Sequence, residues 1–232
     1  MQETFEVLFN LSYLILIISL GLKILRKTEG SKYFKLFGYM ALILGFGDAF
    51  HLIPRIYSHL TSGTEELIVA LGFGTLVASI TMTIFYIIFY EAWKVRYNLN
   101  TSKILDIVVY ILGITRILIL FCPRNEWFIR EASISWAIYR NIPFTLMGLL
   151  IIFLFYKKAV EYRDRDYKLI SIAVFLSFAF YLPVAIGASS YPILGSLMLP
   201  KTLAYVWIIA IGYKQLKNHI EDTSRESMNL NQ

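Results

Sequence analysis

Residues 67–92 read LIVALGFGTLVASITMTIFYIIFYEA, and Glu91, near the end, is the only charged residue among them. An α-helix needs about 20 predominantly apolar residues to cross the hydrocarbon core of a bilayer. This stretch exceeds that length, and its apolar and polar residues do not alternate as they do in a half-buried strand. The sequence therefore predicts a transmembrane helix over residues 67–92.

Six further stretches have a similar length and composition: 7–25, 34–57, 104–122, 134–156, 168–189 and 193–213. Only α-helices and closed barrels satisfy their backbone hydrogen bonds inside a bilayer, and each stretch is too long for a barrel strand. We therefore expect an all-α, polytopic membrane protein, with a bundle of seven transmembrane helices over residues 1–220. Residues 221–232 are polar, and we expect them to form a frayed cytoplasmic tail.

The composition agrees with a membrane protein and excludes several other classes. Hydrophobic residues make up 57% of the 232 residues and charged residues 16%, whereas a soluble domain carries about 25% charged residues. Cys122 is the only cysteine, which excludes an internal disulfide and a CxxC motif. The net charge of +6 does not indicate a nucleic-acid partner, because the basic residues lie in loops between the apolar stretches.

The charges of the expected loops alternate along the chain. The second loop carries Glu65 and Glu66, the fourth mixes both signs, and the sixth has no charge. The other loops and the tail are basic: Lys23, Arg26, Lys27, Lys32 and Lys35; Lys94, Arg96 and Lys103; Lys157, Lys158, Arg163, Arg165 and Lys168; Lys214 and Lys217. Cytoplasmic loops are rich in lysine and arginine. We therefore expect the N-terminus outside and the C-terminus in the cytoplasm, in a bacterial-type plasma (inner) membrane.

Several ionisable residues lie inside the expected spans: Asp48, His51, Arg55, Arg116, Arg140 and Lys201. A charge near the centre of a span costs at least ~2.5–3.5 kcal/mol and usually faces the bundle interior or water. From the helical rise per residue, Asp48 and Lys201 lie roughly 12–14 Å below the outer surface, and Arg116 and Arg140 about 7–9 Å. Asp48, His51 and Arg55 share one helical stripe because their spacing is i, i+3, i+7.

These deep charges predict an outward-facing basic cavity. Arg116, Arg140 and Lys201 are three cations, and Asp48 is the one acid near them. Such a surplus of positive charge is costly inside a membrane unless the cavity is hydrated or holds an anion. We expect a small anionic or zwitterionic ligand, lipid headgroups included, bound by a receptor, a sensor or a transporter component; a sensor would need a partner protein. Kinks at prolines would open space beside the site. The remaining expected site residues and kinks are His51, Ser79, Trp136, Tyr139, Tyr181, Tyr205, Pro143, Pro183 and Pro200.

Structural interpretations of the same residues stay open. Arginine side chains near helix ends, Arg55 above all, can reach the headgroups. Asp48 and Lys201 have matched depths, so we expect them to be in contact, and that ion pair could be purely structural. His51 lies in a span while His59 and His219 lie in loops on opposite sides, so no three-histidine zinc site is expected. The sequence indicates no cofactor.

The stretch GFGDAFHLIPR, residues 45–55, carries two resemblances. GFGD matches the GxGD motif of intramembrane aspartyl proteases, but their chemistry needs a second aspartate at the same depth. Asp106 and Glu91 lie at the expected cytoplasmic ends of their spans, so neither can meet Asp48. GDAFHLIPR resembles the aspartate-bearing helix of lysoplasmalogenase-like (YhhN-like) bacterial membrane proteins. That resemblance implies acid/base catalysis by Asp48 on a lysolipid, and a hydrolase that uses Asp48 and His51 is our alternative function. That family also has a second aspartate in a later helix, which this sequence lacks.

Overall fold

The computed structural model describes residues 2–61, 67–100, 102–129, 133–187 and 191–230, and all regular structure in these ranges is helical. The elements are α1 (Gln2–Arg26), α2 (Lys32–Thr61), α3 (Ile68–Arg96), α4 (Lys103–Leu120), η1 (Pro123–Asn125), α5 (Ile134–Glu161), α6 (Arg165–Gly187), η2 (Pro192–Leu197) and α7 (Met198–Leu230). The expectation of an all-α bundle is confirmed.

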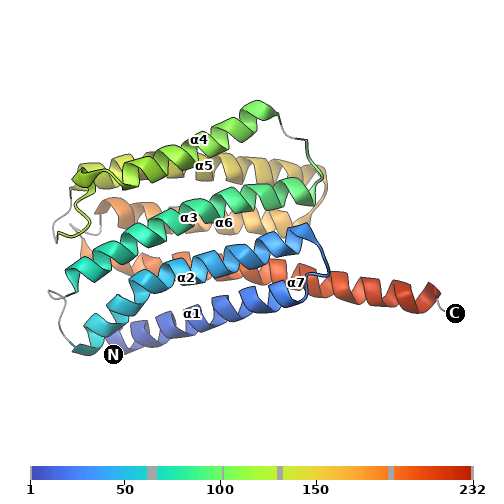
Figure 1. The fold of residues 1–232 in the computed structure, drawn as a ribbon, viewed down its shortest axis with the longest axis horizontal. Helices are drawn as coiled ribbons and strands as arrows, with labels where there is room; N and C mark the ends of the chain where they lie inside the picture. The colour runs from blue at the N-terminus through green and yellow to red at the C-terminus, as the bar shows by residue number, and fades with distance from the viewer. Residues whose placement is uncertain (1, 62–66, 101, 130–132, 188–190, 231–232) are drawn as a thin grey trace.

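The helices run up and down as a bundle (Figure 1). Each α-helix packs against the next one along the chain, and α1 also contacts α7, so the sequence of contacts closes on itself. We call the side that carries the start of α1 the N-terminal face and the opposite side, where α7 leaves the bundle, the C-terminal face. The loop residues Glu65, Glu66, Arg130 and Glu131 lie outside the described residues.

Six helices, α1, α2, α3, α5, α6 and α7, are long and apolar enough to cross a membrane. This is the build of a multi-pass membrane protein, and large apolar side chains such as Phe46, Phe50 and Ile53 on α2 are more than half exposed on its outside. α4 has only 18 residues and carries Lys103, Asp106 and Arg116. It packs between α3 and α5 in the same bundle. Its three charged residues make it less apolar than the six helices that could cross a membrane.

The positions of Asp48 and His51 follow from a close approach of α2 and α3. A Cβ on Gly47 would lie 1.9 Å from Thr81 Oγ1, and a Cβ on Gly74 would lie 2.1 Å from the carbonyl oxygen of Phe50. No larger residue fits at either position, because such distances are far inside van der Waals contact. The glycines thus let the two backbones meet, as small residues do in membrane bundles.

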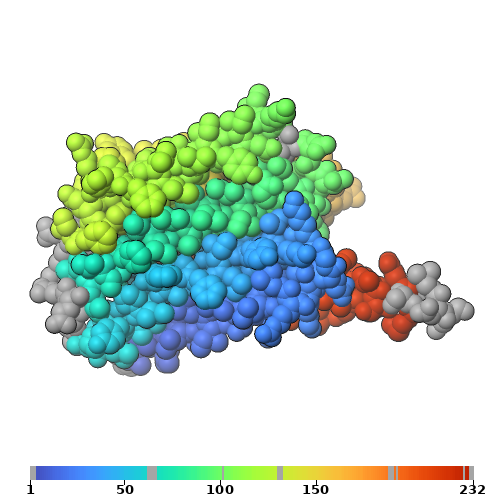
Figure 2. All heavy atoms as spheres, viewed as in Figure 1, coloured from blue at the N-terminus to red at the C-terminus, as the bar shows by residue number. Residues whose placement is uncertain are grey.

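The start and end of α7 differ from the sequence prediction. The expected span begins at residue 193, but Pro192–Leu197 form a 3₁₀ helix and α7 begins at Met198. Pro200 therefore lies in the first turn, where a missing N–H is harmless, and the expected kink there is wrong. Pro143 and Pro183 do lie inside α5 and α6. The expected frayed tail is instead helical through Leu230 and projects beyond the bundle (Figure 2).

Candidate functional site

A cavity of about 170 Å³ lies between α1, α2 and α7 toward the N-terminal face. One water needs roughly 10–15 Å³ in such a space, so the cavity is large enough for a small organic molecule. Its lining combines charged, polar and apolar side chains: Phe5, Glu6, Asn10, Asp48, His51, Leu52, Arg55, Gly195, Ser196, Met198, Leu199, Lys201 and Thr202. Three of the predicted site residues, Asp48, His51 and Lys201, are therefore brought together.

Asp48 is held in place by α1. The hydroxyl of Tyr13, which is 3% exposed, donates a hydrogen bond of 2.6 Å to Asp48 Oδ2. Such a short bond to a carboxylate is characteristic of charge-assisted pairs. Tyr13 thus orients the carboxylate and leaves its other oxygen without a partner among the described residues.

Lys201 approaches the cavity from α7. Its Nζ lies 4.6 Å from the ring centroid of Tyr181 and 5.8 Å from that of Tyr205, so the two aromatic faces stabilise the ammonium group. The predicted ion pair with Asp48 is absent among the ion pairs of the described residues. Asp48 is bonded to Tyr13 and Lys201 lies against the two aromatic rings, so the two opposite charges share a cavity without forming a direct ion pair.

His51 lines the cavity and is held by α3. Its Nδ1 lies 3.1 Å from Thr75 Oγ1, and the same hydroxyl lies 2.8 Å from the carbonyl oxygen of Leu71. Thr75 thus fixes the orientation of the imidazole ring beside Asp48.

The outer rim of the cavity is formed by an ion pair that sequence reasoning missed. Arg55 Nε donates to Glu6 Oε1, and His59 Nε2 lies 3.6 Å from the same oxygen. The expectation that Arg55 reaches the headgroups stays a prediction, and the structure adds that its side chain pairs with Glu6. With Glu6 included, the cavity lining carries two carboxylates and two permanent cations. This cavity is charge-balanced rather than basic.

Arg116 does not line this cavity, although it lies in the interior of the bundle as the sequence predicted. It is 1% exposed and its guanidinium carbon lies 3.4 Å from the ring centroid of Phe144 on α5. The alternative that Arg116 extends to the membrane surface is therefore wrong. Two of its nitrogens, Nε and Nη1, are buried without a hydrogen-bond partner among the described residues.

Arg140 also lies apart from the cavity, near the α4–α5 connection. Its Nη1 donates to Asn125 Oδ1 at 3.3 Å, and its guanidinium lies 4.4 Å from the ring centroid of Trp127. Asn125 is itself fixed by bonds from its Nδ2 to backbone carbonyls of Ile119 and Cys122. The structure thus distributes the three predicted cations between the cavity and two separate contacts.

The four aromatic residues predicted for the site, Trp136, Tyr139, Tyr181 and Tyr205, are also separated in the structure. Tyr181 and Tyr205 contact Lys201, and Tyr181 also donates to Asn141 Oδ1 at 2.7 Å. Tyr139 is 52% exposed and packs edge-to-face on Trp136, and neither of these residues lines the cavity.

Ser79 does not take part in the cavity either. Its hydroxyl donates to the carbonyl oxygen of Thr75 in its own helix at 2.7 Å. Thr83 bonds to the carbonyl of Ser79 in the same manner. In an apolar environment the carbonyl one turn earlier is the nearest acceptor, so the hydroxyls of Ser79 and Thr83 bond within α3 rather than across helices.

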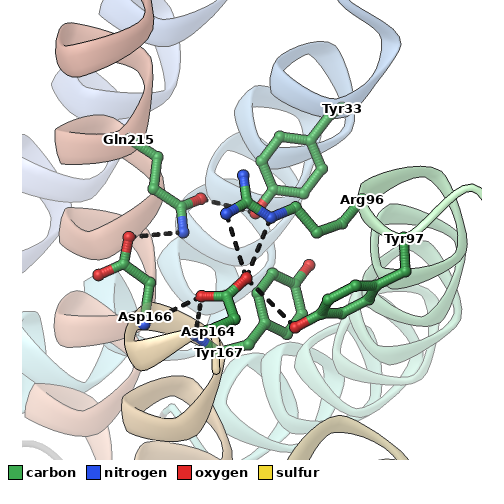
Figure 3. Close-up of polar contacts among 7 residues, drawn as sticks. All are labelled: Tyr33, Arg96, Tyr97, Asp164, Asp166, Tyr167 and Gln215. Carbon is green, nitrogen blue, oxygen red and sulfur yellow. Dashed lines mark hydrogen bonds and ion pairs between the residues drawn. The ribbon is translucent and has the colours of Figure 1, made fainter. Parts of the chain in front are cut away.

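A second polar cluster, which sequence reasoning missed, lies at the C-terminal face (Figure 3). Asp164 Oδ2 accepts from Arg96 Nε and Nη2 at 3.2 and 3.1 Å and from the Tyr97 hydroxyl at 3.2 Å. Its Oδ1 accepts from the backbone N–H groups of Asp166 and Tyr167, which caps the start of α6. One carboxylate thus joins the ends of α3 and α6.

The same cluster extends to α2 and α7. The Tyr33 hydroxyl donates to Gln215 Oε1 at 2.7 Å, and Gln215 Nε2 donates to Asp166 Oδ2 at 2.9 Å. We call Tyr33, Arg96, Tyr97, Asp164, Asp166, Tyr167 and Gln215 the C-face network. Burial and the neighbouring Asp164 carboxylate raise the pKa of Tyr97 well above its usual range, so Tyr97 remains a neutral donor.

Comparison with known proteins adds no relative. No family model matches the chain, and neither a curated protein nor a solved structure matches it. Within the described ranges, no group of three histidine, cysteine or acidic side chains is arranged to hold a metal ion.

Proposed function

We propose that the protein binds a small zwitterionic ligand in the α1–α2–α7 cavity. The observation that carries this proposal is that Asp48 and Lys201 face the same cavity without pairing with each other. An ammonium group of the ligand would bind Asp48, and its carboxylate or phosphate would bind Lys201. Each charge of the ligand then supplies the partner that one side chain lacks.

The charge balance of the lining favours a zwitterion over a simple anion. The negative charges of Glu6 and Asp48 equal in number the positive charges of Arg55 and Lys201. A neutral but dipolar ligand enters such a site without leaving an uncompensated buried charge, which is the costly state in a membrane. Phe5, Leu52, Met198 and Leu199 add apolar surface for the rest of the ligand.

We propose that this cavity opens to the outside of the membrane. We propose that α4 also spans the membrane, in addition to the six long apolar helices. The N-terminus would lie outside and the C-terminus in the cytoplasm, and the membrane would be a bacterial-type plasma membrane. The support is the concentration of lysine and arginine in the loops of the C-terminal face. The protein would act as a receptor, a sensor or a transporter component.

A matched series of probes tests the requirement for both charges. γ-Aminobutyrate carries an amine and a carboxylate, while butyrate and butylamine each carry only one of them. Titration calorimetry on the protein in nanodiscs should show γ-aminobutyrate binding at least about tenfold more tightly than either, since a lost charged contact costs about 1.5–3 kcal/mol. Butyrate binding as tightly as γ-aminobutyrate would contradict the zwitterion.

Glycerophosphoethanolamine tests the lipid-headgroup source of the same chemistry. If the natural ligand is a headgroup, this soluble headgroup should compete with γ-aminobutyrate, and nanodiscs containing phosphatidylethanolamine should weaken the apparent binding of both. Lys201→Met should remove binding of all zwitterionic probes. Tyr139→Leu is the matched control, because that side chain lies outside the cavity.

The alternative function is hydrolysis of a lysolipid. The arrangement that favours it is the shared cavity of Asp48 and His51, an acid and an imidazole that could both take part in proton transfer. A hydrolase should lose turnover but keep substrate binding in Asp48→Asn, because only proton transfer is removed. A binding protein should lose affinity in the same variant and release no fatty acid from a lysophospholipid.

A further inference from the structure

A hollow at the C-terminal face carries arginines that the C-face network does not use. It is lined by Arg96, Tyr97, Tyr162, Arg163, Asp164, Arg165 and Asp166. Asp164 pairs with Arg96 and accepts from Tyr97, and one oxygen of Asp166 accepts from the neutral amide of Gln215, so the lining carries three arginines against two carboxylates. Arg163 and Arg165 are exposed and form no ion pair with any described residue. After these bonds are counted, two free guanidinium groups remain at the rim of the hollow.

The backbone position of Arg163 disfavours an arginine. Its amide bonds to the Val160 carbonyl at 3.3 Å and the Asp164 amide to the Ala159 carbonyl at 2.8 Å, which is the Schellman ending of a helix. Arg163 adopts a φ of 53° there, in the left-handed region that favours glycine. Glycine would adopt this backbone conformation without strain, so the fold itself does not require an arginine at this position.

Arg165 is also poorly suited to its place in the fold. It is the first residue of α6, and the start of a helix carries partial positive charge, which a basic residue opposes. Two arginines, separated in the chain by Asp164, thus occupy positions where local backbone energetics prefer other residues. Both are explained if an anion lies between them.

We propose that Arg163 and Arg165 bind a phosphate group in this hollow. Arginine is suited to phosphate because its planar guanidinium donates two parallel hydrogen bonds. Tyr162, which is 55% exposed beside Arg163, offers a hydroxyl as an additional donor. The phosphate belongs either to an anionic phospholipid of the facing leaflet or to a soluble phosphate compound. This site is independent of the N-terminal-face cavity.

The test compares lipid retention in native mass spectrometry of the whole protein. Wild-type protein should retain phosphatidylglycerol in preference to phosphatidylcholine, and Arg163→Gly with Arg165→Gln should weaken that retention by about tenfold to thirtyfold, as expected for two cationic contacts at a membrane surface. Lys23→Gln with Lys27→Gln is the matched control of equal charge on the same face. An equal loss in the control would show a general surface-charge effect and overturn the site.

Two further readouts complete the test. Arg163→Gly alone should melt at the same temperature as the wild type or higher, because glycine relieves the left-handed backbone, and it should still lose retention. Added inorganic phosphate should compete with phosphatidylglycerol if the site accepts soluble phosphate, and leave retention unchanged if it requires the lipid. Absence of both lipid preference and inorganic phosphate binding in the wild type would overturn the proposal.

Discussion

The N-terminal-face cavity and the C-face network are built from the same kinds of side chain but differ in how these are satisfied. In the network, Asp164 accepts from Arg96, Tyr97 and two backbone amides (Figure 3). In the cavity, the Asp48 carboxylate accepts one hydrogen bond among the described residues, from Tyr13, and the Lys201 ammonium group lies against two aromatic rings. A fully bonded cluster stabilises the fold, whereas separated charges around a cavity retain the capacity to bind a ligand.

The largest effect should come from breaking the C-face network. Asp164→Ala removes the bonds to Arg96 and Tyr97 and the cap of α6, so the free energy of unfolding should fall by about 2–4 kcal/mol. Chemical unfolding in mixed micelles measures this change. Glu161→Gln is the control, because Glu161 pairs with Lys158 within one exposed helical turn; a similar loss there would remove the distinction between the two regions.

The cavity should respond differently to loss of its charges. Because Asp48 and Lys201 form no direct ion pair, a double-mutant cycle of Asp48→Leu and Lys201→Met should give a coupling energy clearly smaller than the ~3–5 kcal/mol that breaking a buried ion pair costs. The cycle is measured by unfolding in the absence of ligand. A large coupling would place the two side chains in a structural ion pair and remove the basis for the zwitterion site.

The aromatic partners of Lys201 should contribute to binding by a smaller amount. Tyr181→Leu removes the ring that lies 4.6 Å from Nζ, so γ-aminobutyrate binding should weaken by about threefold to tenfold, the range of a cation–π contact. Tyr139→Leu should leave the affinity unchanged. Equal losses in the two variants would mean that the effect does not act through Lys201.

The smallest effect is on the pH dependence of stability. The raised pKa of Tyr97 means that the unfolded chain loses this proton first as pH rises. The stability contributed by Tyr97 is therefore intact below about pH 10, the pKa of a free tyrosine, and is lost as pH rises above that value. Tyr97→Phe should make the fall in melting temperature between pH 10 and 11 less steep, and an unchanged slope would contradict the contact with Asp164.

The sequence predicts which ionisable residues lie in the interior of the bundle far better than it predicts the neighbours that each of them meets. Asp48 and Lys201 were expected at one depth, and they share a cavity. Arg116 was also correctly expected to be interior, yet it faces Phe144 on the other side of the bundle. Counting residues from a helix end gives height, but which neighbours a side chain meets depends on how the helices pack, and the pattern of apolar residues does not determine that.

Partners supplied by α1 and by the loops were not predictable for the same reason. Tyr13 and Glu6 became site residues only because α1 packs against both α2 and α7. Asp164 lies in a loop that the sequence marks only as basic, and its role depends on the meeting of α3 and α6. The helix-forming stretches themselves were clear, because a long apolar segment has few other stable structures in a bilayer.

The central claim is that Asp48 and Lys201 bind opposite ends of one zwitterion. Solid-state NMR can measure this on wild-type protein in nanodiscs with ¹⁵N,¹³C-labelled γ-aminobutyrate, from the dipolar couplings to labelled Asp48 Cγ and Lys201 Nζ. Strong coupling of the ligand amine to Asp48 and of its carboxylate carbon to Lys201 is the predicted result. Strong coupling between Asp48 Cγ and Lys201 Nζ themselves, with no coupling of either to the ligand, would contradict the account.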